Sequence, residues 1–474
     1  MDTLNKEKNL NLFNGMIIYA AGNFGTKILS FLIVPLYTYY ITAESMGTYD
    51  LLITTINLLI PIVTLQVSDA AYSWIMCKKA VENICIKSTF QILIFNTVIS
   101  SLIIIGVNQF YPIPYCLEFI LVLASSNALS IAQKLLRGLK NQKLFAVSGI
   151  IYTFIFLILN VIQICIFNLG VKSLFTSSIV SNILTLIVIF ILENKLRTCL
   201  IDTIDLKLIK QMLGFSIPLI ANQLSWWVIN SSDRYIITFF LGKAANGIFS
   251  ISYKFPTILQ MLLNLFNTAW QDVSIVDNDV DKGRYYSKVF KQLYIISFTI
   301  LLPLVPITKI AINLVVEDSY KSAASYISFL YLGTIFQAFS SFYGVGYLRN
   351  KQTKQASLTS VYGAIVNAVV NLILVKFIGL QAASISTFLG FFVMWIVREK
   401  QNRDELGIHI NIGNFTKFFI PILIFCIVLC ISNMFVDILF AIIGALIFIK
   451  VNFKYLYNLF KYLLLLLRKI VRFK

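Results

Sequence analysis

The sequence predicts an all-α polytopic membrane protein with about fourteen transmembrane helices, in which two pseudo-symmetric six-helix lobes precede a C-terminal helix pair. Three observations lead to this fold class: a series of long apolar stretches, an alternation of basic residues between them, and an internal repeat. The 474 residues are 58% hydrophobic and only 13% charged, with a mean hydropathy of +0.82. This composition excludes a water-soluble globular chain.

The apolar stretches are separated by short polar segments, and most of them approach the ~20 residues that a helix needs to cross a bilayer. They are residues 13–39, 46–70, 88–107, 115–136, 145–167, 171–192, 214–239, 245–270, 292–312, 323–346, 357–376, 380–397, 416–433 and 435–449. The last pair is the shortest, because the segment from Phe415 to Lys450 must cross twice. Whether this pair fully spans the bilayer stays open.

Lysine and arginine residues collect in every second gap between the apolar stretches. Most of the 39 basic residues thereby fall on one side, for example in the segments 134–143 and 195–210. The positive-inside rule assigns this side to the cytoplasm, so both termini are expected there. The net charge of +18 is then explained by loops that face anionic lipid headgroups, and it gives no reason to expect a nucleic-acid partner.

An internal repeat divides the chain. A shift of 200 places residues 39–49 on residues 239–249, and a shift of 209 places 139–141 on 348–350. Because six helices separate equivalent positions, both repeats enter the membrane from the same side, about an axis along the membrane normal. We therefore expect an N-terminal lobe over residues 10–196, a C-terminal lobe over 205–400, two further helices over 415–450 and a basic amphipathic helix over 451–474.

Several short motifs occur in a characteristic order between residues 10 and 450. They are Gly22-Asn23-Phe24-Gly25-Thr26-Lys27, Gly47-Thr48-Tyr49-Asp50, Asp69-Ala70-Ala71-Tyr72, Ile217-Pro218-Leu219, Ser231-Ser232-Asp233-Arg234-Tyr235, Leu241-Gly242 with Gly247, and Ala269-Trp270. In this order they resemble the bacterial polysaccharide flippases of the multidrug, oligosaccharidyl-lipid and polysaccharide (MOP) exporter superfamily. One departure is Ser73, which stands where these proteins commonly have an arginine.

The resemblance implies a fold like that of the multidrug and toxin extrusion (MATE) transporters of this superfamily. It also implies an activity in the bacterial plasma membrane: an undecaprenyl-diphosphate-linked oligosaccharide is moved from the cytoplasmic to the outer leaflet by alternating access, for surface polysaccharide biosynthesis. The implied partners are this polyprenyl-diphosphate-linked oligosaccharide, the bilayer, and polysaccharide polymerase and chain-length machinery. The sugar composition, the coupling ion and the oligomeric state are not implied.

Three basic residues lie inside the predicted spanning segments: Lys27, Arg234 and Lys254. A charge at the bilayer centre costs on the order of 2.5–3.5 kcal/mol, so such residues usually face a bundle interior or a water-filled cavity. We expect these three cations to hold the diphosphate of the lipid carrier. The alternative is that Lys27 and Lys254 are neutral or paired structural residues, and that Arg234 is tied to its neighbour Asp233.

The seventh predicted helix carries an unusually polar run. It consists of Asn222, Gln223, Trp226, Trp227 and Asn230, and Asn23 lies one turn before Lys27 in the first helix. A polar stripe in a spanning helix implies contact with water, with substrate or with another helix. We expect these residues to line the substrate path, where the indole rings would stack on sugars; packing between helices is the alternative.

Carboxylates near helix ends are candidates for coupling to an ion gradient, namely Asp69 and Asp233 together with Asp50 and Glu118. A solvated carboxylate at a helix end needs no such role, and that interpretation stays open. The chain has no glycine-rich phosphate loop, and its seven cysteines show no metal-ligand spacing. We therefore expect no cofactor, no metal and no enzymatic activity.

Two other classes of protein remain to be weighed. A multidrug or cation antiporter of the same superfamily would share the two lobes, but it would need an acidic cavity, and Lys27 and Lys254 argue against that. A membrane polymerase or glycosyltransferase would need catalytic groups in a substantial outer loop. The longest predicted outer loop covers only residues 313–322, which leaves little room for such a site.

Overall fold

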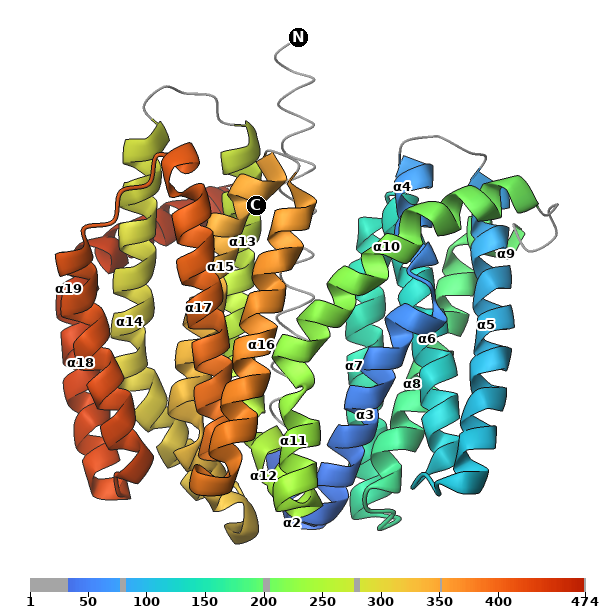
Figure 1. Cartoon of the computed structure of the whole chain (residues 1–474), viewed down its shortest axis with the longest axis horizontal. Coiled ribbons are helices and arrows are strands. Elements are labelled where there is room, and N and C mark those ends of the chain that lie inside the picture. The colour runs from blue at the N-terminus through green and yellow to red at the C-terminus, as the bar shows by residue number, and fades with distance from the viewer. Residues whose placement is uncertain (1–32, 77–81, 199–204, 277–281, 350–351, 473–474) are drawn as a thin grey trace. The chain divides into compact units, whose positions relative to one another are not determined.

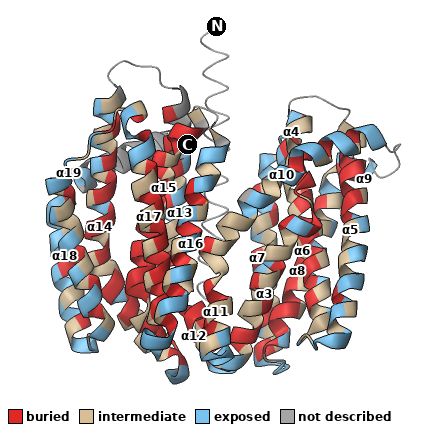
Figure 2. Cartoon of the chain, viewed as in Figure 1, coloured by how far each residue is buried: buried red, intermediate tan, exposed pale blue. Residues whose placement is uncertain are grey.

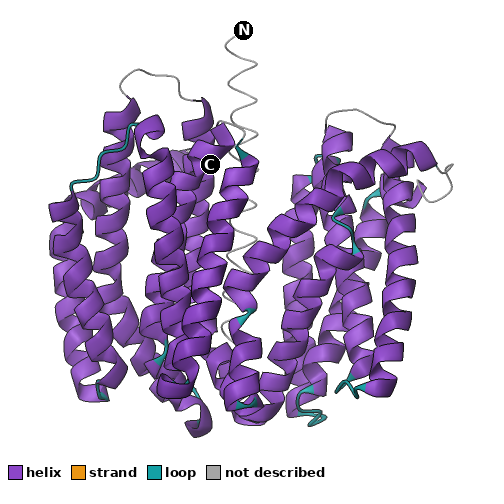
Figure 3. Ribbon diagram, in the orientation of Figure 1, coloured by secondary structure: helices purple, strands orange, loops and turns teal. Residues whose placement is uncertain are grey.

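The computed structural model describes residues 33–76, 82–198, 205–276, 282–349 and 352–472. Within these ranges the chain is helical, with short turns and no strand (Figures 1 and 3). The helices are α2 (Val34–Tyr40), α3 (Ala43–Val63), α4 (Val67–Met76), α5 (Glu82–Phe110), α6 (Cys116–Gly138), α7 (Gln142–Cys165), α8 (Lys172–Leu192), α9 (Asn194–Thr198), α10 (Leu206–Ser231), α11 (Asp233–Leu241), α12 (Lys243–Lys254), α13 (Pro256–Val276), α14 (Lys282–Val315), the 3₁₀ helix η2 (Asp318–Ser325), α15 (Ile327–Arg349), α16 (Thr353–Ile378), α17 (Gln381–Leu406), α18 (Ile412–Ile431) and α19 (Met434–Arg472).

Many of these helices are long and apolar enough to cross a membrane. Among the described residues, 11 helices meet both conditions: α3, α5, α6, α7, α8, α10, α14, α16, α17, α18 and α19. The predicted class, an all-α multi-pass membrane protein, is thereby confirmed. The count of fourteen stays a prediction. Most of the first predicted span, 13–39, lies outside the described residues, the span 245–270 is divided between α12 and α13, and α15 is not among the eleven.

Exposed residues lie on the outer faces of the helices and buried residues lie between the helices of each unit (Figure 2). Many of the exposed residues have large apolar side chains. On α5, for instance, Phe95, Leu102 and Ile103 are 67%, 63% and 60% exposed. Water would make such a surface costly, whereas the acyl chains of a bilayer cover it without penalty. These faces are therefore the lipid-contacting surface of the protein.

Three predicted spans are interrupted. The span predicted over 46–70 ends as a helix at Val63; Leu65 and Gln66 then adopt φ values of 47° and 52°, and α4 follows. The span over 214–239 divides into α10 and α11 at Ser232. The span over 245–270 divides into α12 and α13 just before Pro256, which lacks the N–H that would continue the first helix.

At the C-terminus the predicted boundary between residues 450 and 451 falls inside one helix. Helix α19 runs without a break for 39 residues, from Met434 to Arg472. The basic amphipathic segment therefore begins as a continuation of the last predicted span, because its sequence contains no proline or glycine to end the helix there.

The helices form two compact units, one ending at Lys254 and the other beginning at Phe255. Helices α10, α11 and α12 pack with the first unit. This division lies about one hairpin later than the lobe boundary that the repeat predicts, near residues 196–205. The two six-helix lobes thus stay a prediction about the repeat, and the description below treats each unit by itself.

In the first unit, α3 and α12 cross at two glycines, Gly47 and Gly247. A Cβ on Gly47 would lie 1.8 Å from the carbonyl oxygen of Lys243, and one on Gly247 would lie 1.9 Å from that of Ala43. Only glycine permits backbones to approach this closely. The contact is reciprocal between positions 200 residues apart, so the two helices pack about a local two-fold axis.

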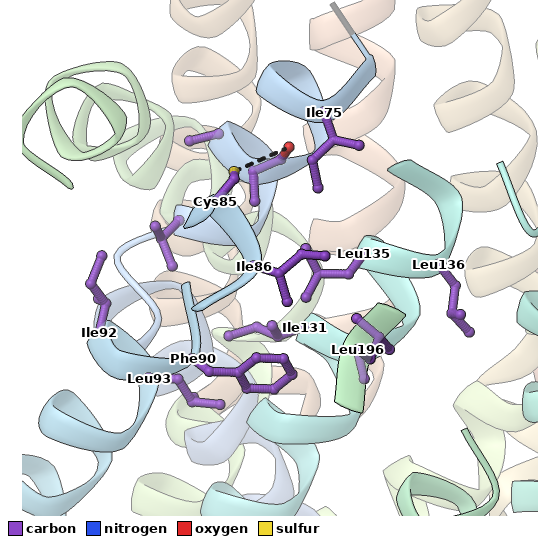
Figure 4. Packing of buried hydrophobic residues seen from close by; sticks show 14 of the residues in the cluster. Ile75, Cys85, Ile86, Phe90, Ile92, Leu93, Ile131, Leu135, Leu136 and Leu196 are labelled. Atoms are coloured by element: carbon purple, nitrogen blue, oxygen red, sulfur yellow. Dashed lines mark hydrogen bonds between the residues drawn. The ribbon is translucent and has the colours of Figure 1, made fainter. Parts of the chain in front are cut away.

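A buried apolar cluster joins α4, α5 and α6 in the same unit (Figure 4). Ala71 of α4 and Ile131 and Leu135 of α6 are fully buried, and the thiol of Cys85 on α5 lies 4.0 Å from the carbonyl oxygen of Ala71. This packing fixes α4 against α6. It thereby sets the positions of the polar residues that flank the cluster on both helices.

In the second unit, Lys309 of α14 reaches the turn between α18 and α19. Its ammonium donates to the carbonyl oxygen of Leu429 at 2.6 Å, to the hydroxyl of Ser432 at 2.5 Å and to a carboxylate oxygen of Asp437 at 3.1 Å. The side chains of Lys309 and Asp437 are only 4% and 1% exposed. A buried ion pair therefore ties the last hairpin to α14.

Candidate substrate cavity

The first unit contains a cavity of about 390 Å³. It lies among α3, α6 and α10 and the turn that leads from α3 into α4. Its lining residues are mostly polar or aromatic: Asn57, Ile60, Pro61, Thr64, Gln66, Ser68, Ser130, Lys134, Gln223, Trp226, Trp227 and Asn230. A polar lining within an apolar bundle is the usual sign of a path for a hydrophilic ligand.

The turn after α3 forms one wall of the cavity. The hydroxyl of Thr64 donates to the carbonyl oxygen of Ile60 at 2.8 Å and accepts from the backbone N–H of Gln66 at 3.3 Å. The side-chain amide of Asn96 on α5 donates to the carbonyl oxygen of Val63 at 2.9 Å, which satisfies an orphan group of the helix end. These bonds hold the left-handed turn that brings Gln66 into the wall.

Helix α10 forms the opposite wall with Gln223, Trp226, Trp227 and Asn230. Their spacing of i, i+3, i+4 and i+7 puts them on one helix face. The indole N–H of Trp227 donates to the carbonyl oxygen of Thr54 on α3 at 3.0 Å, and this bond orients the ring. The structure thus brings four residues of the predicted polar run to one cavity. Asn222 also lies on α10, and its side chain is outside the described part of the structure.

Lys134 supplies a positive charge to the cavity. Its ammonium lies 2.5 Å from a carboxylate oxygen of Asp69 in the first turn of α4, and the two side chains are 30% and 31% exposed. The sequence interpretation missed Lys134, since it counted this residue with the basic cytoplasmic segments. The structure places it inside α6, one turn before the helix ends at Gly138. The one sign of this position in the sequence is that Lys134 falls within the last residues of the apolar stretch 115–136.

Arg234 and Lys254 lie in a separate cluster and are not among the residues that line the cavity. The guanidinium of Arg234 lies 3.5 Å from a carboxylate oxygen of Asp50, donates to the carbonyl oxygen of Asn230 at 2.7 Å and lies 4.4 Å from the ring centre of Tyr253. Lys254 also interacts electrostatically with Asp50. The two predicted cations therefore share one carboxylate close to the α3–α12 crossing.

The surroundings of this cluster are also polar and aromatic. The amide of Asn246 donates to Asp50 at 3.4 Å and to the carbonyl oxygen of Gly47 at 2.9 Å, and the ammonium of Lys254 lies 4.5 Å from the ring centre of Tyr37. Asp233, predicted as a coupling acid, is 1% exposed. The substrate and coupling roles of these residues stay predictions.

Two predicted site residues, Asn23 and Lys27, lie outside the described residues. Their assignment to the substrate path stays a prediction. In the part of the chain that the structure does describe, no group of three or more His, Cys, Asp or Glu side chains could hold a metal ion. What the described cavity offers is a set of amide and hydroxyl groups, two indoles and one ammonium.

Two solved structures share the fold of this chain. Over 93% of the chain it resembles the whole of a solved structure of "Lipid II flippase MurJ, inward closed conformation", with a TM-score of 0.69 at 14% identity. Over 85% of the chain it resembles 96% of an inward-facing multidrug resistance MATE family transporter of the MOP superfamily, with a TM-score of 0.65 at 14% identity. The chain therefore shares its overall fold with these two solved structures.

The sequence comparison then gives the family. Residues 12–271 match the family described as "Polysaccharide biosynthesis protein", and the chain belongs to this family. A curated relative, the "Uncharacterized membrane protein MJ1068" of Methanocaldococcus jannaschii, is 25% identical over 199 residues. That match covers 40% of this chain and spans only 38% of the relative's length.

Proposed function

We propose that this protein is a flippase that moves a polyprenyl-diphosphate-linked oligosaccharide from the cytoplasmic to the outer leaflet of the bacterial plasma membrane, for surface polysaccharide biosynthesis. The observation that carries the proposal is the amide- and indole-lined cavity in a chain of the polysaccharide biosynthesis family. A solved structure with the same fold is named as a lipid II flippase, which supports a lipid-linked substrate here.

Each part of such a substrate has a suitable environment. Amides of Asn57, Gln223 and Asn230 can exchange hydrogen bonds with sugar hydroxyls, and the indole of Trp226 offers an apolar face to a sugar ring. An ammonium group suits the diphosphate as a point charge. The polyprenyl tail stays among the acyl chains, because the exposed helix faces are apolar.

The predicted topology indicates the side from which the substrate would enter. With both termini in the cytoplasm, the Lys134 end of α6 points to the cytoplasmic side, where the substrate would enter. Arg234 and Lys254 share Asp50 beside the α3–α12 crossing and do not line the cavity, so an entering headgroup would meet Lys134 first. Alternating access then carries the headgroup outward, and polysaccharide polymerase and chain-length machinery would use the product.

Deletion of the gene in its host tests this proposal. We expect lipid-linked oligosaccharide to accumulate in the cytoplasmic leaflet and surface polysaccharide to disappear, because the intermediate can no longer cross. The wild-type gene should restore the polysaccharide, and a gene encoding Gln223→Ala with Trp226→Ala should restore only a small part of it. Gln355→Ala, an exposed position on α16, is the matched control and should restore it fully.

The same strains separate the two classes of transporter. A deletion strain that keeps its surface polysaccharide and becomes hypersensitive to cationic drugs would contradict the proposal. It would favour the multidrug or cation antiporter instead.

A further inference from the structure

Lys134 is the one basic residue among the described residues that line the cavity. Its partner Asp69 lies in the first turn of α4 and is not itself part of the lining. About a third of each side chain is exposed, so the pair borders the cavity and is not sealed inside the protein. A ligand in the cavity can therefore reach the ammonium.

The positions of the two groups do not depend on the ion pair. Ala70 and Ala71 follow Asp69 directly, Leu135 follows Lys134, and all three are fully buried in the α4–α6 packing. Partly exposed ion pairs contribute little to stability, so an anion that enters the cavity can displace the carboxylate at a small cost. The apolar packing thus holds a cation beside the cavity while its carboxylate partner remains exchangeable.

The other basic residue near the end of α6, Arg137, contacts aromatic rings. Arg137, one turn after Lys134 on α6, lies 5.5 Å from the ring centre of Tyr72 and 5.7 Å from that of Phe145. These cation–π contacts hold the guanidinium of Arg137 against the two rings. If another anion displaces the carboxylate of Asp69, the ammonium of Lys134 can bind that anion directly.

We propose that Lys134 is the phosphate-binding cation of this cavity, and that Asp69 occupies it until the diphosphate headgroup enters. This inference rests on the proposed function and gives the substrate's anionic group a specific contact. On binding, the ammonium transfers its hydrogen bonds from the carboxylate to phosphate oxygens, and no covalent bond changes. The carboxylate of Asp69 thereby competes with incoming anions for Lys134, so the empty site binds other anions only weakly.

Binding to the purified protein in nanodiscs tests this exchange. The probes are undecaprenyl diphosphate, uncharged undecaprenol and inorganic diphosphate, and binding is followed by tryptophan fluorescence. We expect Lys134→Met to weaken binding of undecaprenyl diphosphate about tenfold or more, since a charged hydrogen bond is lost. Asp69→Asn should tighten it about two- to fivefold, because the internal competitor is removed. The double variant should bind like Lys134→Met alone.

A second ion pair provides the control. The ammonium of Lys195 lies 2.6 Å from a carboxylate oxygen of Glu82, and the two side chains are 55% and 41% exposed. Neither residue lines the cavity. Lys195→Met and Glu82→Gln should leave binding unchanged. Each variant is first checked for normal insertion and thermal unfolding, so that a folding defect is not read as a binding defect.

Three results would overturn the inference. These are equal binding by the wild type and Lys134→Met, weaker binding by Asp69→Asn, or inorganic diphosphate binding as tightly as the lipid. The first two would leave the flippase intact and remove the exchange, whereas the third would assign the site to a free anion. Failure of the flippase proposal itself would appear separately, as normal surface polysaccharide in the deletion strain.

Discussion

Gly247→Ala is expected to destabilise the first unit strongly. The added methyl would lie 1.9 Å from the carbonyl oxygen of Ala43, and a backbone atom cannot rotate away as a flexible side chain can. Overpacking costs about 1–3 kcal/mol or more, and this contact belongs at the upper end of that range. Thermal unfolding of the purified protein should show a large drop in melting temperature, and little protein should reach the membrane.

Gly47→Ala should have a similar effect, because its methyl would meet the carbonyl oxygen of Lys243 at 1.8 Å. Gly106→Ala on α5 is the matched control: nothing lies within 4 Å of its added carbon, and alanine is the better helix former. If Gly47→Ala and Gly247→Ala unfold at the temperature of Gly106→Ala, the two helices do not cross at these glycines.

Lys309→Met is expected to cost about 3–5 kcal/mol of stability, because it leaves the carboxylate of Asp437 buried without its cation. The carbonyl oxygen of Leu429 and the hydroxyl of Ser432 each lose the hydrogen bond from the ammonium as well. Unfolding in detergent, followed by fluorescence, should therefore begin at a lower temperature. Limited proteolysis should first cleave the chain near the α18–α19 turn.

The double variant Lys309→Met with Asp437→Leu should recover much of this loss, since apolar replacement of both partners removes the unpaired charge. Lys321→Met removes an exposed pair with Asp318, whose side chains are 43% and 84% exposed, and should change stability by less than about 1 kcal/mol. A Lys309→Met protein as stable as Lys321→Met would show that the buried pair does not hold the hairpin.

The sequence was sufficient for the fold class, because apolar length and the positions of basic residues follow directly from the bilayer. It was insufficient for the breaks within helices. Leu65 and Gln66 adopt a left-handed conformation that neither residue type favours, so only tertiary contacts can select it. Pro256, by contrast, is a visible sign of the α12–α13 break, because proline lacks the N–H that would continue a helix, yet the predicted span 245–270 runs through it.

The candidate site also combines features that the sequence predicts with features that depend on tertiary contacts. The polar run of α10 was visible because polar residues are rare in spanning helices, and four of its members line the cavity. Lys134 was missed, since a basic residue near a helix end is indistinguishable in sequence from one in a cytoplasmic loop. The pairing of Arg234 with Asp50 joins residues that are far apart along the chain, which no local pattern can reveal.

The most direct test of the central claim is transport by the purified protein. Vesicles are prepared with lipid-linked oligosaccharide from the host in both leaflets, and an impermeant reagent reports how much of it is accessible from outside. The account predicts that the inner pool becomes accessible in vesicles that contain the protein and stays protected in protein-free vesicles. An inner pool that stays protected with correctly folded protein, under both proton and sodium gradients, would contradict it.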